Sequence, residues 1–289
     1  MRTVVAAALA LFAALAVGCA RDDTPSSMID DAGYHVRGGA VYYLNPFPGK
    51  AFRIDSADPG TFEAFDRTYA RDGERVYIDG HPLQGAQAGS FELLGRPGLA
   101  RDDGRVYQRD RIISTDPDGF ELLDAGLARD RAHVYWSDGS VLSDDPRHFT
   151  IVSDRDDYLY AKDSRAVYVN GTLIEGASPQ GFRVLDGAYS TDGVAAFSFD
   201  RLIPDADVPT LRTLGGPYAV DAQRVYWMGR AIEGADPGSF AVLNVNFECS
   251  ADRHRAYYRQ AVIVDADPAA FPPGRPVTGC SETSISFGG

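Results

Sequence analysis

A short phrase recurs along this chain at a near-constant interval, and it restricts the possible folds more than any other feature. In each copy, an aspartate is followed five residues later by an aromatic residue. Successive aspartates lie 30, 28, 33, 29, 29 and 31 residues apart. Such a period indicates a tandem-repeat architecture. The seven pairs are Asp72/Tyr77, Asp102/Tyr107, Asp130/Tyr135, Asp163/Tyr168, Asp192/Phe197, Asp221/Tyr226 and Asp252/Tyr257.

A second phrase keeps the same period. Thirteen or fourteen residues after each aromatic comes a large apolar residue, usually preceded by Asp-Pro. A degenerate eighth copy stands first, with Val41-Tyr42 followed by Asp58-Pro59. The apolar residues of the other seven copies are Phe91, Phe120, Phe149, Phe182, Leu211, Phe240 and Phe271.

Local chemistry predicts short strands within each copy. The apolar segments 167–169 and 172–174 flank Asn170-Gly171, which favours the tight type I′ turn of a β-hairpin. Asp-Pro suits the start of a single helical turn, because the Asp side chain caps free N–H groups and Pro presets φ. An extended segment then leads to the next repeated aspartate. Each copy is therefore predicted to hold three or four strands.

These features predict an all-β tandem array of about eight repeats of ~30 residues, each containing a β-hairpin. We expect each repeat to bury its aromatics against the next, in a superhelical or solenoid-like stack. A closed eight-bladed β-propeller is the alternative, although about 30 residues is short for a four-stranded blade.

The N-terminal segment predicts export and a lipid anchor. Arg2 and an apolar run up to Val17 read as a signal peptide over residues 1–18. Small residues before Cys19 resemble a lipobox, which implies lipidation of Cys19. An ordinary secretory peptide, or a short uncleaved anchor, is the other interpretation.

The lipoprotein interpretation divides the chain into three segments. The signal peptide spans 1–18, the lipidated Cys19 and a flexible tether span 19–33, and a single β-repeat domain with a C-terminal cap spans 34–289. By resemblance to enterobacterial sorting rules, Ala20 favours a periplasm-facing lipoprotein of the outer membrane.

The other two cysteines, Cys249 and Cys280, are predicted to form a disulfide in an oxidising compartment. Cys280 lies in the non-repetitive tail, so the bond would fasten the end of the array. A redox or metal pair is disfavoured because neither cysteine has a Cys-x-x-Cys partner.

The formal net charge of −13 indicates which partners to expect. An acidic surface repels nucleic acid and anionic lipid headgroups, so we expect no nucleic-acid partner and membrane contact through the N-terminal lipid alone. The same acidity is compatible with basic partners, or simply with solubility.

The repeated aspartates are interpreted as architectural, because a carboxylate heading a loop stabilises it by accepting backbone N–H groups. Calcium would need several oxygen ligands in one loop, which no copy offers. The denser acidic spots Asp116/Asp118 and Asp154/Asp156/Asp157 are not repeated. No cofactor or metal is expected.

Aromatic residues at one repeat position are the weak binding candidates. The residue after each core aromatic points to the other face of its strand. Trp136, Trp227 and Tyr258 occupy this position and are able to stack on sugars or anchor a protein partner. The alternative is that a neighbouring repeat covers them.

The repeat phrases also resemble a known family. The segments 160–179 and 218–237, with their Tyr-Ala-x-Asp and Asp-Pro or Ser-Pro elements, are similar to the DKNYY repeat family of bacterial envelope proteins. The resemblance covers roughly residues 41–271. This chain lacks the Lys-Asn pair and mostly replaces the second tyrosine, and the resemblance implies no particular activity.

Catalysis has little support in the sequence. Neither a Gly-x-Ser-x-Gly elbow nor a His-Glu-x-x-His motif occurs, and the five histidines occupy different repeat positions. We therefore expect a non-enzymatic, lipid-anchored binding or scaffold protein that recognises an envelope protein or a glycan. The alternatives are an immunity-type inhibitor of a periplasmic toxin and, less favoured, a glycan-active enzyme.

Overall fold

A computed structural model describes residues 24–289 and divides the chain into two compact units, the first ending at Ile112 and the second running from Ile113 to Gly289. The sequence predicts a single domain over 34–289, and the two units divide this range after Ile112. Cys19 and the predicted signal peptide lie outside the described residues. Within residues 24–289, no helix is long and apolar enough to cross a membrane.

The segment predicted to be a flexible tether has local structure in its second half. A backbone hydrogen bond from Ile29 N–H to the Ser26 carbonyl closes a turn. Arg37 forms an ion pair with Asp30 and holds this turn against the first strand.

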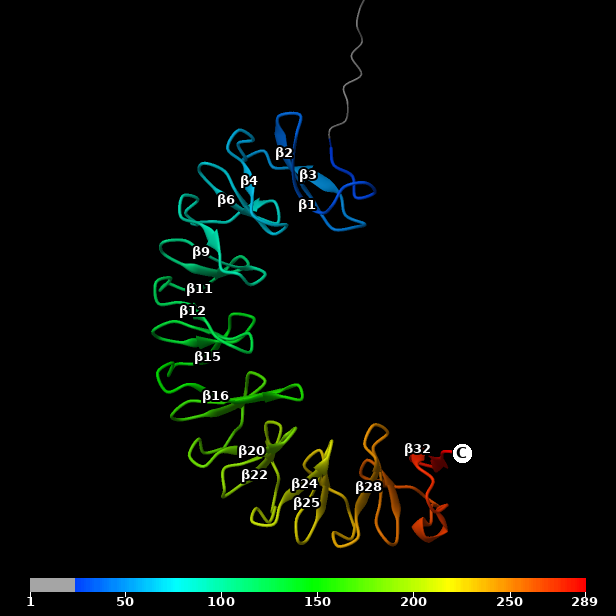
Figure 1. The fold of residues 1–289 in the computed structure, drawn as a ribbon. Helices are drawn as coiled ribbons and strands as arrows, with labels where there is room; N and C mark the ends of the chain where they lie inside the picture. The colour runs from blue at the N-terminus through cyan, green and yellow to red at the C-terminus, as the bar shows by residue number, and fades with distance from the viewer. Residues whose placement is uncertain (1–23) are drawn as a thin grey trace, which may run out of the picture. The chain divides into compact units, whose positions relative to one another are not determined.

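The first unit is built from antiparallel meanders (Figure 1). A three-stranded sheet comes first, and two four-stranded sheets follow it in chain order. The last residues of β11 fall in the second unit. The strands are β1 (Gly33–Arg37), β2 (Ala40–Leu44), β3 (Ala51–Arg53), β4 (Glu63–Ala64), β5 (Tyr69–Arg71), β6 (Val76–Ile78), β7 (His81–Pro82), β8 (Glu92–Leu93), β9 (Leu99–Arg101), β10 (Val106–Gln108) and β11 (Arg111–Ser114).

The second unit continues the same pattern with five four-stranded meanders and a terminal two-stranded hairpin. The one helical element described is the 3-10 turn η1 (Pro268–Ala270). The strands are β12 (Glu121–Leu122), β13 (Ala128–Arg129), β14 (Val134–Tyr135), β15 (Val141–Ser143), β16 (Thr150–Arg155), β17 (Tyr158–Lys162), β18 (Val167–Val169), β19 (Thr172–Leu173), β20 (Arg183–Asp186), β21 (Tyr189–Thr191), β22 (Ala196–Ser198), β23 (Arg201–Leu202), β24 (Arg212–Gly215), β25 (Tyr218–Val220), β26 (Val225–Trp227), β27 (Arg230–Ala231), β28 (Ala241–Asn244), β29 (Cys249–Ala251), β30 (Ala256–Tyr258), β31 (Ala261–Val262), β32 (Val277–Ser281) and β33 (Ser284–Phe287).

These elements confirm the predicted all-β repeats. The turn between β18 and β19 has positive φ at both Asn170 (45°) and Gly171 (80°), as a type I′ turn requires. The Asp-Pro segments each form one hydrogen-bonded turn, for example from Ser239 N–H to the Asp236 carbonyl. The β14–β15 hairpin has a longer connection, residues 136–140, and a register shift in the strand pairing beside it.

The core lies between successive sheets rather than within one of them. In the second unit, Tyr160 and Phe182 pack with Phe197 of the following sheet. Burying each such aromatic contributes about 1.5–3 kcal/mol. The first strands contact one another in chain order, from β16 through β20, β24 and β28 to β32. Within this unit the sheets form an open series, not the closed propeller that was the alternative.

The hydrogen bonds of the repeated aspartate explain why the core aromatic lies five residues after it. One oxygen of Asp221, Oδ1, accepts the backbone N–H groups of Gln223 (2.8 Å) and Arg224 (2.7 Å). The other, Oδ2, accepts the Tyr226 hydroxyl (2.6 Å) and the backbone N–H of Asp207 (2.9 Å) from the turn before. The carboxylate therefore joins the turn, the loop and the core strand of its repeat.

The same arrangement recurs in the other copies. Asp72, Asp102 and Asp252 accept equivalent bonds from two loop N–H groups, a tyrosine hydroxyl and a preceding turn. In two copies a buried serine, Ser114 or Ser143, mediates the contact with the preceding turn. The aspartates are thus part of the scaffold.

Candidate binding groove

The longest hairpin in the second unit arises where the repeat spacing is largest. Tyr160 comes 11 positions after Phe149, compared with 7 positions from Phe182 to the equivalent Tyr189. The additional residues lengthen β16 and β17, and the tip of this hairpin projects beyond those of the following sheets (Figure 1). Its tip carries the acidic spot Asp154/Asp156/Asp157 that stands out in the sequence.

A second long spacing between repeat positions occurs near the C-terminal end of the series. Cys249 comes 9 positions after Phe240, and the additional residues form the loop 245–248 between β28 and β29. Because each sheet is a meander, the β16–β17, β20–β21, β24–β25 and β28–β29 turns all lie on one side of the series. The additional residues of the β16–β17 hairpin and of the 245–248 loop therefore lie on the same side of the series of sheets.

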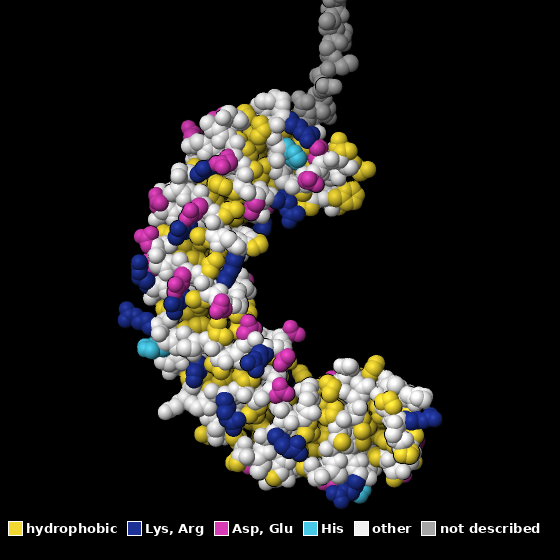
Figure 2. All heavy atoms as spheres, in the orientation of Figure 1, with side chains coloured by type: hydrophobic (Ala, Val, Ile, Leu, Met, Phe, Trp, Pro, Cys, Tyr) yellow, Lys and Arg dark blue, Asp and Glu magenta, His cyan; other side chains and the backbone are white. Residues whose placement is uncertain are grey.

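Two adjoining hollows lie among these turns, with volumes of about 560 Å³ and 480 Å³. They share four lining residues, Asp156, Tyr158, Asp186 and Gly187, so they form one continuous depression. We call it the hairpin groove. Figure 2 shows acidic side chains gathered over the β16–β17 hairpin at its edge. The groove is lined by residues 151–156, 158, 160, 184–188, 216–217, 228, 245–246 and 248.

A series of buried tyrosines fixes the turns that line the groove. The Tyr189 hydroxyl donates to the Pro217 carbonyl (2.8 Å), and the Tyr218 hydroxyl donates to the Glu248 carbonyl (2.6 Å). Likewise, the Tyr160 hydroxyl donates to the Gly187 carbonyl (3.2 Å). Each phenol thus holds the turn of the following sheet. Burial is the main reason that the pKa of Tyr218 is raised to about 12, so its hydroxyl is protonated at neutral pH.

The floor of the second hollow is largely apolar. Tyr158, Ala188, Pro217, Met228 and Val245 line it. Met228 and Val245 are 44% and 42% exposed, so their apolar atoms are accessible from the groove.

Close packing of one turn on the next shapes this floor. A Cβ at Gly216 would lie 2.6 Å from Val245 Cγ1, and Gly216 also has a positive φ of 55°. Only glycine allows the 245–248 loop to pack so closely against the preceding turn.

The rim of the groove carries carboxylates without counter-ions. Asp154, Asp156, Asp157 and Asp186 are exposed, and within residues 24–289 their side chains form no ion pair or hydrogen bond. Arg155 is the basic residue among those that line the groove. The carboxylates outnumber it, so the local potential is negative.

The aromatic residues predicted as binding candidates lie elsewhere, between successive repeats. A Cβ at Gly171 would come within 2.9 Å of Trp136 Cδ2, so the Trp136 ring packs against the following turn. The Arg259 guanidinium stacks over both Trp227 and Tyr258, 5.7 Å and 5.0 Å from the ring centroids. All three aromatics are half-buried, and none lines the groove.

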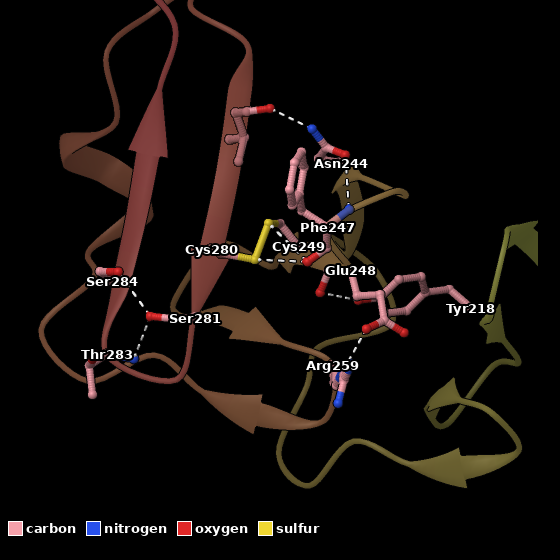
Figure 3. The surroundings of a disulfide bond; sticks show 11 residues. Tyr218, Asn244, Phe247, Glu248, Cys249, Arg259, Cys280, Ser281, Thr283 and Ser284 are labelled. Carbon is pink, nitrogen blue, oxygen red and sulfur yellow. Dashed lines mark hydrogen bonds and ion pairs between the residues drawn. A yellow bond between two sulfur atoms is a disulfide. The ribbon is translucent and has the colours of Figure 1, made fainter.

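The Cys249–Cys280 disulfide joins the terminal hairpin to the sheet that forms one wall (Figure 3). Beside it, Asn244 Nδ2 donates to the Val277 carbonyl (2.7 Å). The Arg259 side chain pairs with Glu248 at the groove. The C-terminal cap therefore supports the 245–248 loop.

The structure adds groove residues that sequence reasoning did not select: Tyr158, Asp186, Met228, Val245 and Glu248. The signal that would have found them is the length of the intervals, since the 33- and 31-residue gaps are where the walls are extended. In the part of the chain that the structure describes, no group of three or more His, Cys, Asp or Glu side chains is arranged to hold a metal ion.

Fold and groove together define an all-β tandem-repeat protein whose turns form an acidic depression with an apolar floor. The DKNYY family model matches residues 34–159, 99–215 and 218–273. These matches cover most of the sequence, and the chain belongs to the DKNYY family. Searches of curated proteins and of solved structures gave no match.

Proposed function

We propose that this chain is a non-enzymatic binding protein of the bacterial envelope, anchored by a lipid on Cys19 at the periplasmic face of the outer membrane. It recognises a protein or glycan partner through the hairpin groove. The observation that carries the proposal is the groove itself, a continuous depression formed by turns of four sheets.

Three features support a binding role. The two longest gaps between repeated aspartates, 33 and 31 residues, place their additional residues at the groove, while the aspartate and aromatic scaffold stays nearly constant. The tyrosine contacts and the disulfide hold the walls in place, which reduces the entropy lost on binding. Exposed apolar side chains on the floor, such as Met228, provide area for contact.

Site-specific photo-crosslinking in the cells that produce the protein tests this function. A photoreactive amino acid replaces Met228 in the groove, and the matched control replaces Val264, which is 66% exposed but lies outside it. We expect a discrete adduct from position 228 and none from position 264. Absence of an adduct at 228, or equal adducts at both positions, contradicts the proposal.

A further inference from the structure

We propose that the hairpin groove accepts an extended segment of a protein partner in which lysine or arginine residues flank an apolar side chain. This inference rests on the proposed function and specifies its partner. It depends on the position of charges and apolar atoms in the groove.

The size of the groove suits a short peptide segment. Each hollow falls within the range of about 300–1,000 Å³ that is typical of ligand sites. Because the two are continuous through Tyr158 and Gly187, a chain is able to run from one into the other with side chains in both.

The two hollows differ in chemistry. The floor of the second is formed by Tyr158, Pro217, Met228 and Val245 and favours an apolar side chain. The first is bordered by Asp154, Asp156 and Asp186 and favours a cation. A segment that places a basic residue beside an apolar one complements both.

The carboxylates remain available to such a segment. Asp154, Asp156, Asp157 and Asp186 have no ion-pair partners within residues 24–289, whereas Glu248 is already paired with Arg259. Unpaired like charges near one another repel, and a basic ligand relieves this repulsion. Complementary charge therefore favours a basic protein segment over an acidic or neutral one.

The floor of the groove suits a glycan less well than it suits a peptide segment. Sugar rings stack on flat aromatic faces. Tyr158 and Tyr160 are the aromatic residues among those that line the groove, and the Tyr160 ring is fully buried. The two tryptophans pack between repeats, so the apolar contact is made mainly by aliphatic and thioether groups.

Fluorescence anisotropy with the full chain in neutral detergent tests the inference. The probe is a short labelled peptide with one leucine flanked by two lysines on each side. Two further peptides replace the lysines by glutamate or the leucine by serine, and empty micelles give the background. We expect binding of the lysine–leucine peptide only, weakened by added salt.

Two variants with the same change of net charge locate the effect. The groove variant carries D154N, D156N, D157N and D186N, and asparagine tolerates the positive φ of residues 156 and 157 (53° and 66°). The control variant carries E175Q, D205N, E233Q and D265N, where exposed carboxylates lie away from the groove and residues 205 and 265 have similar φ (54° and 63°).

The groove variant is expected to bind the lysine–leucine peptide about tenfold more weakly, and the control variant to bind it as the natural chain does. Equal weakening in both variants shows general charge attraction and overturns the inference, as does binding of the glutamate peptide.

The crosslink at position 228 separates the two proposals. An adduct that persists in the groove variant keeps the proposed function and rejects the basic partner.

Discussion

The Tyr226 hydroxyl donates to Asp221 Oδ2 at 2.6 Å, in a buried contact between a core strand and the loop before it. Burial by itself raises the pKa of Asp221, but bonds from Tyr226 and from three backbone N–H groups outweigh it and hold this pKa below its ordinary value. The carboxylate is therefore charged and fully engaged. Equivalent aspartate–tyrosine pairs in five other copies make this contact the repeated joint of the fold.

Loss of the hydroxyl is expected to weaken its repeat. Y226F removes one bond to a buried carboxylate, which lowers the free energy of unfolding by about 1.5–3 kcal/mol. D221A is expected to cost more, because three backbone N–H groups lose their acceptor. Urea unfolding followed by circular dichroism measures both. Equal costs for Y226F and D221A would contradict the assignment of this carboxylate as the repeated joint.

Acid is expected to destabilise the repeats together. The seven repeated aspartates all have a pKa below the ordinary value of 3.8, because their hydrogen bonds outweigh the effect of burial. A lowered pKa in the folded state gives stability that is complete above about pH 5, well above the unfolded pKa, and is lost as pH falls through the folded pKa. Circular dichroism across an acid titration should show this loss. A stability independent of pH between 5 and 2 would argue against it.

Gly171 is expected to be required for the packing of Trp136. G171A introduces a Cβ at a φ of 80° and within 2.9 Å of the ring. Gly176 has the same φ of 80° with nothing near its Cβ position, so G176A reports the backbone strain alone, about 1–2 kcal/mol. Thermal unfolding should show the larger loss for G171A. Equal losses of thermal stability in G171A and G176A would show that contact with the Trp136 ring adds nothing to the cost of G171A.

The disulfide is expected to stabilise the end of the array locally. Cys249 and Cys280 are 31 residues apart, and breaking a bond that closes such a loop costs about 3.7 kcal/mol on the chain-entropy model. Hydrogen exchange in a C280S variant should rise in β32–β33 and in the 245–248 loop, with β16–β23 unaffected. A rise spread evenly over the second unit would indicate that the sheets unfold as one body.

Cys19 is expected to carry the lipid anchor. In C19S, incorporation of labelled fatty acid should fall to background, and the protein should move from the membrane fraction to the soluble one, because stable anchoring requires acyl chains. Cell fractionation with C280S as the matched cysteine control measures this. Retention of label in C19S would indicate another modified residue, whereas retention in the membrane fraction without label would favour an uncleaved anchor.

The regularity of the chain allowed much of the scaffold to be predicted. Asn170-Gly171 determines its turn through local φ preferences, and the spacing of Asp221 from Tyr226 follows from one loop whose bonds are nearly all local. The groove was not predicted, because Asp186, Met228 and Val245 come from three different sheets and have no common pattern in the sequence. The acidic spot at 154–157 was visible, yet nothing local indicated that it borders an apolar floor.

The sequence by itself determined the period and the strands and turns of each repeat, since these depend on residues within one copy. It predicted the Cys249–Cys280 pairing only with Cys19 assigned to the lipid anchor. The tertiary structure decided what each side chain faces. Trp136, a candidate for binding in sequence, packs under the following turn, whereas Met228 lies in the groove. The physical reason is that each repeat buries its surface against the next, so exposure depends on the neighbouring repeat and not on the residue's own copy.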